Sequence, residues 1–173
     1  MDKTRRIPAK QEVRPRAGRP QMPKSYGLKG PRSGSGLMPW SWASAQLGKA
    51  RNYWVCTVRA DGRPHAMPVW GVWLEGKLYF GTSRSSQKGR SLERDPRVVV
   101  HVESGDEAVI LEGVAEEVTE RDRYAAYADA YDAKYQFRPE PHSRDDVTYA
   151  VRPLTVFGWL EKDYTGSATR WKF

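Results

Sequence analysis

The chain has 173 residues and a formal net charge of +8 at neutral pH, a length that suits one domain with its own hydrophobic core. No stretch approaches the roughly 20 apolar residues of a membrane helix, and the N-terminus lacks the apolar region of a secretory signal. The single cysteine, Cys56, excludes a disulfide framework. We therefore expect a cytoplasmic protein that does not bind a membrane.

The positive charge lies in one segment. Residues 1–36 hold ten Lys or Arg and two Asp or Glu, whereas residues 37–173 hold nineteen of each sign. Because residues 1–36 are also rich in Pro, Gly and Ser, we expect an extended or disordered arm, followed by a folded domain over residues 37–173. The arm either contacts an anion, such as nucleic acid or an acidic cofactor tail, or is a solubilising leader. Apolar residues between Tyr26 and Met38 leave open that its second half packs onto the domain.

A helix and three strands are expected in the first half of the domain. Ser41 is a candidate cap for a helix over residues 42–52 with one apolar face. Aromatic and β-branched residues then predict strands, and the pairs Asp61-Gly62 and Glu75-Gly76 predict tight turns between them. These strands are expected over residues 52–59, 64–74 and 77–82.

The second half is expected to hold two helices and four strands. A short helix over residues 85–96 begins at serines and ends at Asp95-Pro96. In a longer helix over residues 120–136, tyrosines recur at the spacing of one helical face. Gly113 indicates a bulge or a close backbone approach, and Pro153 is expected to separate the last two strands. The four strands are expected over residues 97–104, 108–118, 147–152 and 154–162.

These elements favour one fold class. Tight turns between the first strands make a doubly wound parallel sheet unlikely in this order. Six or seven strands with few helices predict a mainly β domain. We expect an antiparallel barrel, closed so that no sheet edge remains, with its helices outside.

The turn over residues 81–90 is the first candidate site. Its hydroxyl groups, together with Lys88 and Arg90, stand at the start of a helix, where free backbone N–H groups point outward. This arrangement is typical of a phosphate site. An ordinary N-capped surface helix has the same pattern, so both interpretations stay open. The hydroxyl groups belong to Thr82, Ser83, Ser85 and Ser86.

The strand over residues 64–74 is the second candidate site. Pro64 and Pro68 lack backbone donors, so part of the strand should be an edge, and its unpaired N–H groups could donate to the carbonyls of a flat ring. An ordinary barrel strand with its tryptophans in the core fits as well. His65 is either a structural residue or a contact to such a ring, and it is a weak candidate proton donor. No histidine pair has metal-ligand spacing, so no metal is expected.

Together these segments resemble one protein family. The chain is similar to pyridoxamine 5'-phosphate oxidase-like proteins over the runs ARNYWVCTVRADGRPHAMPVWGVW, KLYFGTSRSSQKGRSLERDPRVVVHVES and EAVILEGVAEEV. The branch it resembles most is the flavin/deazaflavin oxidoreductase group called type B. The resemblance implies an FMN-binding split β-barrel that forms a homodimer, with two identical sites at the subunit interface that each use both chains.

The resemblance also assigns residues to a cofactor. In such proteins the turn that matches Thr82 to Lys88 holds the cofactor phosphate, and the strand that matches His65 to Trp70 runs beside the isoalloxazine ring. An aromatic residue and an arginine near the C-terminus approach from the partner chain. By itself, the pair Arg170-Trp171 fits a packed final strand equally well. The residues expected at the cofactor are His65, Met67, Pro68, Val69, Trp70, Thr82, Ser83, Ser86, Gln87, Lys88, Arg170 and Trp171.

The chain departs from the namesake oxidase of this family. That oxidase carries Arg, Lys and Arg where this chain has His65, Trp70 and Gln87, and its vitamin-B6 substrate motif is absent here. Oxidation of pyridoxamine phosphate is therefore not expected. Type B relatives often use coenzyme F420, a deazaflavin with an acidic oligoglutamate tail that a basic arm would suit. The resemblance thus implies an F420-dependent oxidoreductase that transfers hydride to a small conjugated substrate, with FMN as the alternative cofactor.

Two further classes of function remain. A non-catalytic protein that carries flavin, deazaflavin or haem would have the same barrel without a substrate pocket. A nucleic-acid binder would use the arm and bind any duplex in a salt-sensitive way. The neutral domain makes nucleic acid the least favoured partner.

Overall fold

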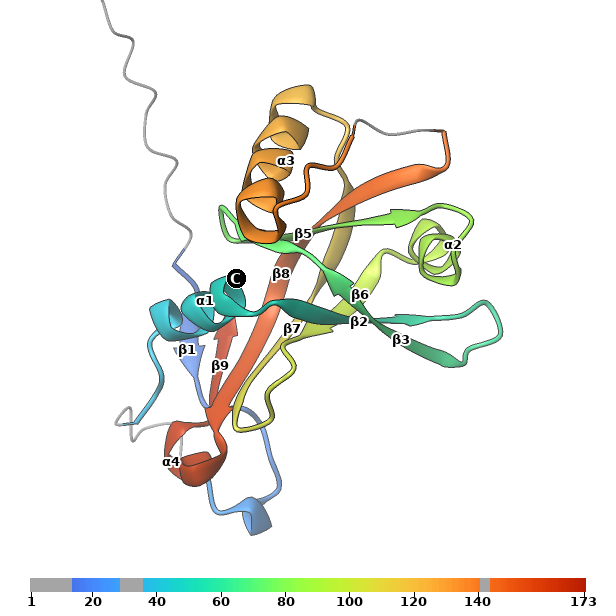
Figure 1. Ribbon diagram of the computed structural model, residues 1–173. Coiled ribbons are helices and arrows are strands. Elements are labelled where there is room, and N and C mark those ends of the chain that lie inside the picture. The colour runs from blue at the N-terminus through green and yellow to red at the C-terminus, as the bar shows by residue number, and fades with distance from the viewer. Residues whose placement is uncertain (1–13, 29–35, 141–143) are drawn as a thin grey trace, which may run out of the picture.

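The structure, a computed structural model, describes residues 14–28, 36–140 and 144–173. Within them a single antiparallel sheet is the main element, and the helices lie around it (Figure 1). The strands are β1 (Arg16–Gly18), β2 (Asn52–Val58), β3 (Pro64–Trp70), β4 (Val72–Leu74), β5 (Lys77–Ser83), β6 (Arg97–His101), β7 (Glu107–Glu117), β8 (Asp146–Leu160) and β9 (Thr169–Lys172). The helices are α1 (Trp40–Lys49), α2 (Gln87–Arg94), α3 (Arg121–Tyr135) and α4 (Tyr164–Ser167), with 3-10 turns η1 (Lys24–Tyr26) and η3 (Glu161–Asp163).

Strand β8 is a central strand of the sheet and pairs with three other strands. It pairs with β7 on one side, and on the other side with β5 near its start and β9 near its end. From β7 the sheet continues through β6 and β2 to β3. The predicted mainly β, antiparallel fold is confirmed, but the predicted closure is wrong. Within the described ranges, β3 pairs only with β2 and β4 only with β5, so the barrel is split and keeps open edges.

The described residues form nine strands rather than six or seven. Strands β1 and β9 pair with each other from opposite ends of the chain, a contact that no local pattern signals. The expected strand over residues 64–74 is divided into β3 and β4. Conversely, the two strands expected on either side of Pro153 are one continuous strand, β8.

A β-bulge explains how β8 accommodates its proline. The register of β7 against β8 shifts between Glu112 and Gly113, so that Gly113 faces Pro153 and Glu112 faces Thr155. A Cβ added to Gly113 would lie 2.4 Å from the carbonyl oxygen of Arg152. The predicted close approach at Gly113 is therefore confirmed. The bulge lets the missing N–H of Pro153 fall where the ladder is already irregular.

Gly71 separates β3 from β4 because its backbone is bonded to α3. Its N–H donates to Tyr135 Oη at 2.9 Å, and its carbonyl accepts from Lys134 Nζ at 2.8 Å. A Cβ on Gly71 would lie 2.7 Å from the carbonyl oxygen of Tyr79, so a larger residue would displace backbone. Helix α3 thereby fixes the point where the chain turns out of the β3 edge.

Two apolar clusters fill the fold. The larger lies between the sheet and α1, with Trp171, Tyr53 and Phe80 among its largest buried members. The smaller joins α3 to β4, β5 and β8 through Tyr127, Tyr131 and their neighbours. The tyrosine face of α3 therefore packs on its own chain. No helix in the described part of the chain is long and apolar enough to cross a membrane.

Helix α1 begins earlier than expected. Pro39, in extended conformation, is its N-cap, and no side chain caps the helix, so the predicted cap at Ser41 is wrong. The fixed φ of proline suits the residue that leads into a helix. The helix ends at Lys49 and leaves Asn52 free to start β2.

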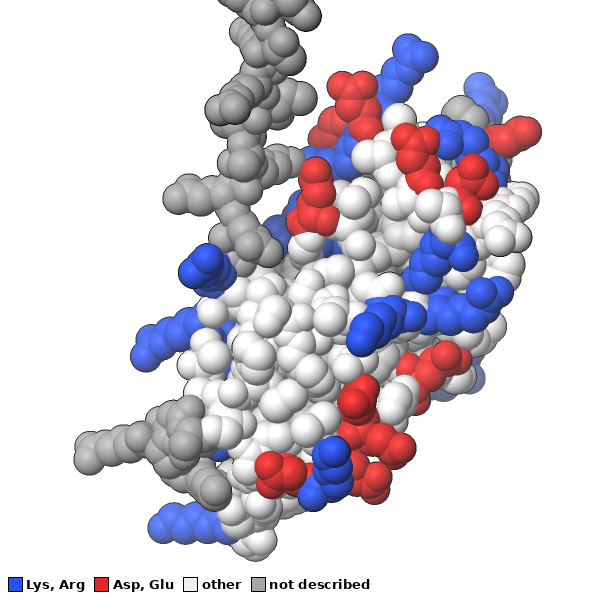
Figure 2. All heavy atoms as spheres, turned by 60° about the vertical axis from the view of Figure 1, so that its left-hand side comes forward, with Lys and Arg blue, Asp and Glu red and all other residues white. Residues whose placement is uncertain are grey.

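Part of the basic segment is packed on the domain. Strand β1 pairs with β9, and the guanidinium of Arg19 donates to the carbonyl oxygens of Gly166 and Ala168 at 2.7 and 2.8 Å. Residues 16–19 are thus extended and packed on the domain rather than disordered, while residues 1–13 and 29–35 lie outside the described residues. On the face in Figure 2, cations and anions both occur around a largely uncharged area, in keeping with the balanced charge of residues 37–173.

Candidate functional site

The turn from β5 into α2 is built as its sequence predicted. Ser86 is the N-cap of α2, and its Oγ accepts from the N–H of Gly89 at 2.9 Å. Thr82 Oγ1 lies 3.1 Å from the same oxygen. A Cβ on Gly89 would lie 2.3 Å from the carbonyl oxygen of Ser83, so glycine allows the helix to start this close to the strand. The first N–H groups of α2 consequently point out of the turn.

A carboxylate that the sequence analysis missed occupies part of this turn. Asp145 accepts from Ser83 Oγ, from Ser85 Oγ at 2.9 Å and from the Ser85 N–H at 3.2 Å. The hydrogen bonds from Ser83, then those from Ser85, lower the pKa of the Asp145 carboxyl. Ser83 and Ser85 are therefore bonded to this carboxylate, whereas Thr82 and Ser86 contact each other, and Lys88 lies on their side of the turn. Asp145 lies 60 residues from Ser85, and no local pattern marks such a contact.

Lys88 is the most unusual side chain of the turn. Only 9% of its surface is exposed, and no carboxylate or hydrogen-bond acceptor among the described residues pairs with its ammonium group. Burial lowers the pKa of the Lys88 ammonium. The Nζ atom keeps some contact with solvent, and a partly desolvated charge of this kind is stabilised when an anion binds beside it.

His65 and Arg59 lie near Lys88. His65 Nδ1 is 3.5 Å from Thr57 Oγ1, and the ring is half-buried. Burial, then the positive charges of Arg59 and Lys88, lower the pKa of the His65 imidazole. Arg59, His65 and Lys88 thus lie close together between β3 and the start of α2. Of the three, only His65 loses its positive charge easily.

Strand β3 presents two different faces at its open edge. His65, Met67 and Val69 lie opposite the buried face of β2, at Thr57, Val55 and Tyr53. Pro68 and Trp70 point to the other face, since side chains alternate along a strand. The structure therefore brings His65 to the phosphate-type turn, whereas Trp70 lies on the opposite face. A flat ligand would contact both sets only along the strand edge itself.

Trp70 has its own set of partners. Its ring stacks on Tyr135 with centroids 4.7 Å apart and planes 3° apart, and the Arg51 guanidinium carbon lies 5.8 Å from the Trp70 centroid. Below the stack, Lys134 Nζ donates to the carbonyl of Ala50 at 2.6 Å and to Tyr53 Oη at 3.1 Å. Burial, then the charge of Arg51, lower the pKa of Lys134 to about 8. This cluster holds the end of β3 rigidly.

The two C-terminal residues differ in accessibility. Trp171 is fully buried in the main cluster, packed edge-on against Trp40 with centroids 5.8 Å apart. Its assignment to a partner's cofactor does not agree with this position, because the indole contributes to the core of its own chain. Arg170 is half-buried on the other face of β9, and its Nε has no hydrogen-bond partner among the described residues.

Arg170 is also far from the turn within one chain. It pairs with Phe157 near the end of β8, whereas Ser83 pairs with Asp146 at the start of β8. Eleven steps along an extended strand span roughly 35 Å. A single chain therefore does not bring Arg170 to the turn. No group of three or more His, Cys, Asp or Glu residues that could hold a metal ion occurs in the described ranges.

The arrangement suits a phosphate attached to a flat ring. The turn offers hydroxyl groups, helix N–H groups and a largely buried lysine without a partner among the described residues, and β3 beside it is an open edge. Because Asp145 already binds two of the serines, the Lys88 side of the turn is where an anion fits. Flavin and deazaflavin cofactors both have this combination of ring and phosphate.

Solved structures show the same fold. A conserved hypothetical protein, Rv2991, from Mycobacterium tuberculosis is 24% identical, with a TM-score of 0.62 over 71% of this chain and 85% of that one. A structure described as an F420 reductase is 24% identical, with a TM-score of 0.53 over 65% of this chain and 94% of that one. A heme binding protein from Mycobacterium smegmatis is 23% identical, with a TM-score of 0.57 over 70% of this chain and 55% of that one. At these identities the likeness establishes the split-barrel fold.

The sequence profile of the family described as pyridoxamine 5'-phosphate oxidase matches residues 43–160. The match covers more than half of the chain, so the protein belongs to the pyridoxamine 5'-phosphate oxidase family, a family of flavin-related oxidoreductases. The predicted family is confirmed. No curated protein matches the chain at a significant level.

Proposed function

We propose that the protein is an oxidoreductase that binds a deazaflavin, coenzyme F420, with the cofactor phosphate beside Lys88 and the ring along the edge of β3. The observation that carries this proposal is Lys88 at the start of α2, a side chain only 9% exposed whose ammonium group has no partner among the described residues. When bound, the cofactor would supply the hydride for a small conjugated substrate. The F420 reductase among the structures of the same fold supports the choice of cofactor.

The residues of the chain have separate tasks in this function. Lys88 provides charge, and the N–H groups at the start of α2 donate to the phosphate. The open edge of β3 offers backbone donors to ring carbonyls. His65, whose pKa is lowered by burial first and then by the charges of Arg59 and Lys88, is the candidate group for exchanging a proton with the substrate. The stack of Trp70 on Tyr135 holds the strand in place.

FMN is the second candidate cofactor, because the same turn suits its phosphate. Compared with the namesake oxidase, however, His65, Trp70 and Gln87 replace three cations that the resemblance places near FMN. A carrier function without catalysis is the third candidate, supported by the heme binding protein of the same fold. We also propose that the protein works in the cytoplasm, where its single thiol stays reduced.

Binding of the two cofactors tests the proposal. F420 and FMN are titrated separately into the cofactor-free protein and followed by fluorescence, with Lys88→Met as the site variant. Lys49→Met, at an exposed lysine at the end of α1, removes the same charge elsewhere and is the matched control. Tight binding of F420 that is weakened about tenfold by Lys88→Met alone supports the proposal. Preference for FMN moves the function to the second candidate, and binding of neither contradicts the site.

We propose further that two copies of the chain form a homodimer with the site at their interface. The open edge of β3 exposes 47% of Met67 and 42% of Trp70, and Arg170 is too distant to serve the turn of its own chain. In a dimer the partner's Arg170 would lie within reach. Light scattering coupled to size-exclusion chromatography measures the mass in solution. A dimer supports the proposal and a monomer at high concentration contradicts it.

A further inference from the structure

A cavity of about 270 Å³ lies between the β2–β3 turn and one face of α2. Two arginines of the turn, Arg59 and Arg63, line it from one side, and Arg90 and Arg94 of the helix line it from the other. Gln87 and Ser91 complete the helical wall. Residues 87, 90, 91 and 94 fall on one helical face by their spacing. The cavity is therefore lined by four arginines, two from the β2–β3 turn and two from α2.

The charge of this cavity is unbalanced. Asp61 is the one carboxylate of its lining, and it is already paired with Arg63, at 2.7 Å between Oδ2 and Nη2. Arg59 Nε is buried and has no hydrogen-bond partner among the described residues. A guanidinium group offers five donors, so single hydrogen bonds to backbone leave most of the donors of this lining available.

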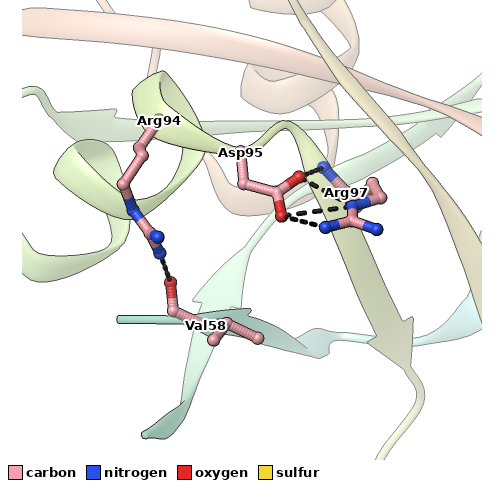
Figure 3. Close-up of polar contacts among 4 residues, drawn as sticks. All are labelled: Val58, Arg94, Asp95 and Arg97. Carbon is pink, nitrogen blue, oxygen red and sulfur yellow. Dashed lines mark hydrogen bonds and ion pairs between the residues drawn. The ribbon is translucent and has the colours of Figure 1, made fainter. Parts of the chain in front are cut away.

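Hydrogen bonds to backbone carbonyls fix the guanidinium groups of Arg90 and Arg94, and Asp61 fixes that of Arg63. Arg94 Nη2 donates to the carbonyl of Val58 at 2.7 Å, which ties the end of α2 to β2 (Figure 3). Arg90 donates to the carbonyl of Ser85. On the other wall, the N–H of Arg59 donates to the carbonyl of Arg63 at 2.9 Å and closes the hairpin. An array of guanidinium groups held in advance binds an anion with less loss of side-chain entropy.

A solvated basic surface would look different. Arg97 follows α2 directly, and its side chain is 82% exposed and fully engaged by Asp95 of the same short segment (Figure 3). Arg63 is paired with Asp61 in the same way and is also exposed, whereas Arg59, Arg90 and Arg94 line the cavity without a carboxylate partner among the described residues. Arg97 is thus an internal comparison for these three cations.

The cavity adjoins the cofactor site. Arg59 belongs to its lining, and both Arg59 and Lys88 act electrostatically on His65. Gln87 of the lining is the residue before Lys88. The cavity and Lys88 are therefore neighbours at the start of α2.

We propose that Arg59, Arg63, Arg90 and Arg94 form a second anion-binding site, which holds a multiply charged phosphate or carboxylate group of the same ligand whose first phosphate lies beside Lys88. The existence of the pocket stands on its own residues, while the shared ligand rests on the proposed function. In this arrangement the folded domain itself, and not only the basic N-terminal segment, recognises an acidic extension of the cofactor. Bidentate arginine contacts to phosphate or carboxylate supply the affinity.

Calorimetry on the full-length, cofactor-free protein tests the pocket at low salt. The probes are tripolyphosphate and a γ-linked triglutamate peptide, which separate a phosphate from a carboxylate preference. The site variant is Arg63→Gln with Arg94→Gln. The matched control is Lys49→Gln with Arg97→Gln, which removes the same charge from exposed positions outside the cavity. We expect either probe to bind the wild type, and to bind the site variant at least about tenfold more weakly than the control.

Each result has one meaning. Equal weakening in both double variants, or no binding of either probe to the wild type, overturns the pocket. F420 binding that is lost in Lys88→Met but unchanged in the site variant overturns the shared ligand and leaves the proposed function intact. Binding of a probe in the cavity by a protein that binds neither F420 nor FMN supports the pocket and overturns the proposed function. Because Arg63 and Arg94 are exposed, the variants should fold, and a thermal melt checks this.

Discussion

At the scale of single residues, the Lys88 side chain that we expect to bind the cofactor phosphate also lowers the stability of the folded protein without ligand. This side chain is largely buried and its ammonium group has no partner among the described residues, so the folded protein without ligand carries a cost for partial desolvation of this charge. Lys88→Met keeps the length of the side chain and removes the charge. We expect the free energy of unfolding without ligand to stay the same or rise by about 1 kcal/mol, while cofactor affinity falls.

Urea denaturation without cofactor measures this effect, with Lys49→Met for comparison. If Lys88→Met instead lowered the free energy of unfolding by several kcal/mol, as expected for a large-to-small core substitution, Lys88 would have a structural partner. The cofactor titration of the same variant measures the expected loss of cofactor affinity.

Gly113 is a residue whose absent side chain matters. A Cβ there would meet the carbonyl oxygen of Arg152 at 2.4 Å, in backbone that cannot swing away. We expect Gly113→Ala to lower the free energy of unfolding by about 1–3 kcal/mol, as overpacking does. Gly48 in α1 has nothing within 4 Å of such a Cβ, so Gly48→Ala should stabilise by up to about 1 kcal/mol. Chemical denaturation of both variants checks the contrast, and equal effects would contradict it.

At the scale of elements, the contact between α3 and the end of β3 should make stability depend on pH. The pKa of Lys134 is about 8 in the folded protein, lowered by burial first, against 10.5 for the free side chain. Between these values the unfolded chain binds the proton more tightly, so the Lys134 contribution to stability rises with pH. Below pH 8 both states are protonated and this contribution stays constant.

The prediction is a difference between two proteins. Denaturation midpoints of the wild type and of Lys134→Met are compared at pH values from about 7 to 10, the range set by the shifted pKa. The wild type should gain stability relative to the variant as the pH rises. Several buried tyrosines have raised pKa values that act in the opposite direction at higher pH, but they are common to both proteins. Parallel curves would contradict the prediction.

Local elements were predictable where local chemistry decides them. The turns at Asp61-Gly62 and Glu75-Gly76, the N-cap at Ser86 and the close approach at Gly113 each follow from residues adjacent in sequence, and the structure contains them. The remaining features depend on distant residues. Asp145 accepts from Ser85, Tyr135 binds Gly71 between β3 and β4, and β1 pairs with β9. None of these contacts produces a pattern within a short window of sequence.

At the scale of the whole molecule, the start and the end of the described chain stabilise each other. Strand β1 covers the outer edge of β9, and Arg19 binds the carbonyls before β9. Removal of residues 1–19 should therefore lower the unfolding midpoint by roughly 4 °C or more, since two charge-assisted hydrogen bonds and a strand pairing are lost. Differential scanning calorimetry measures the shift. An unchanged midpoint would show that β1 adds no stability to the sheet.

The open edge of β3 also bears on how the protein behaves at high concentration. An edge that can receive a flat ring offers the same backbone groups to any extended chain, including a β-strand from a misfolded neighbour. Pro64 and Pro68 remove a donor at two positions of this seven-residue strand, so a foreign strand could not form an uninterrupted ladder along it. The two prolines of β3 thus also protect the protein against aggregation at the edge that its ligand would use.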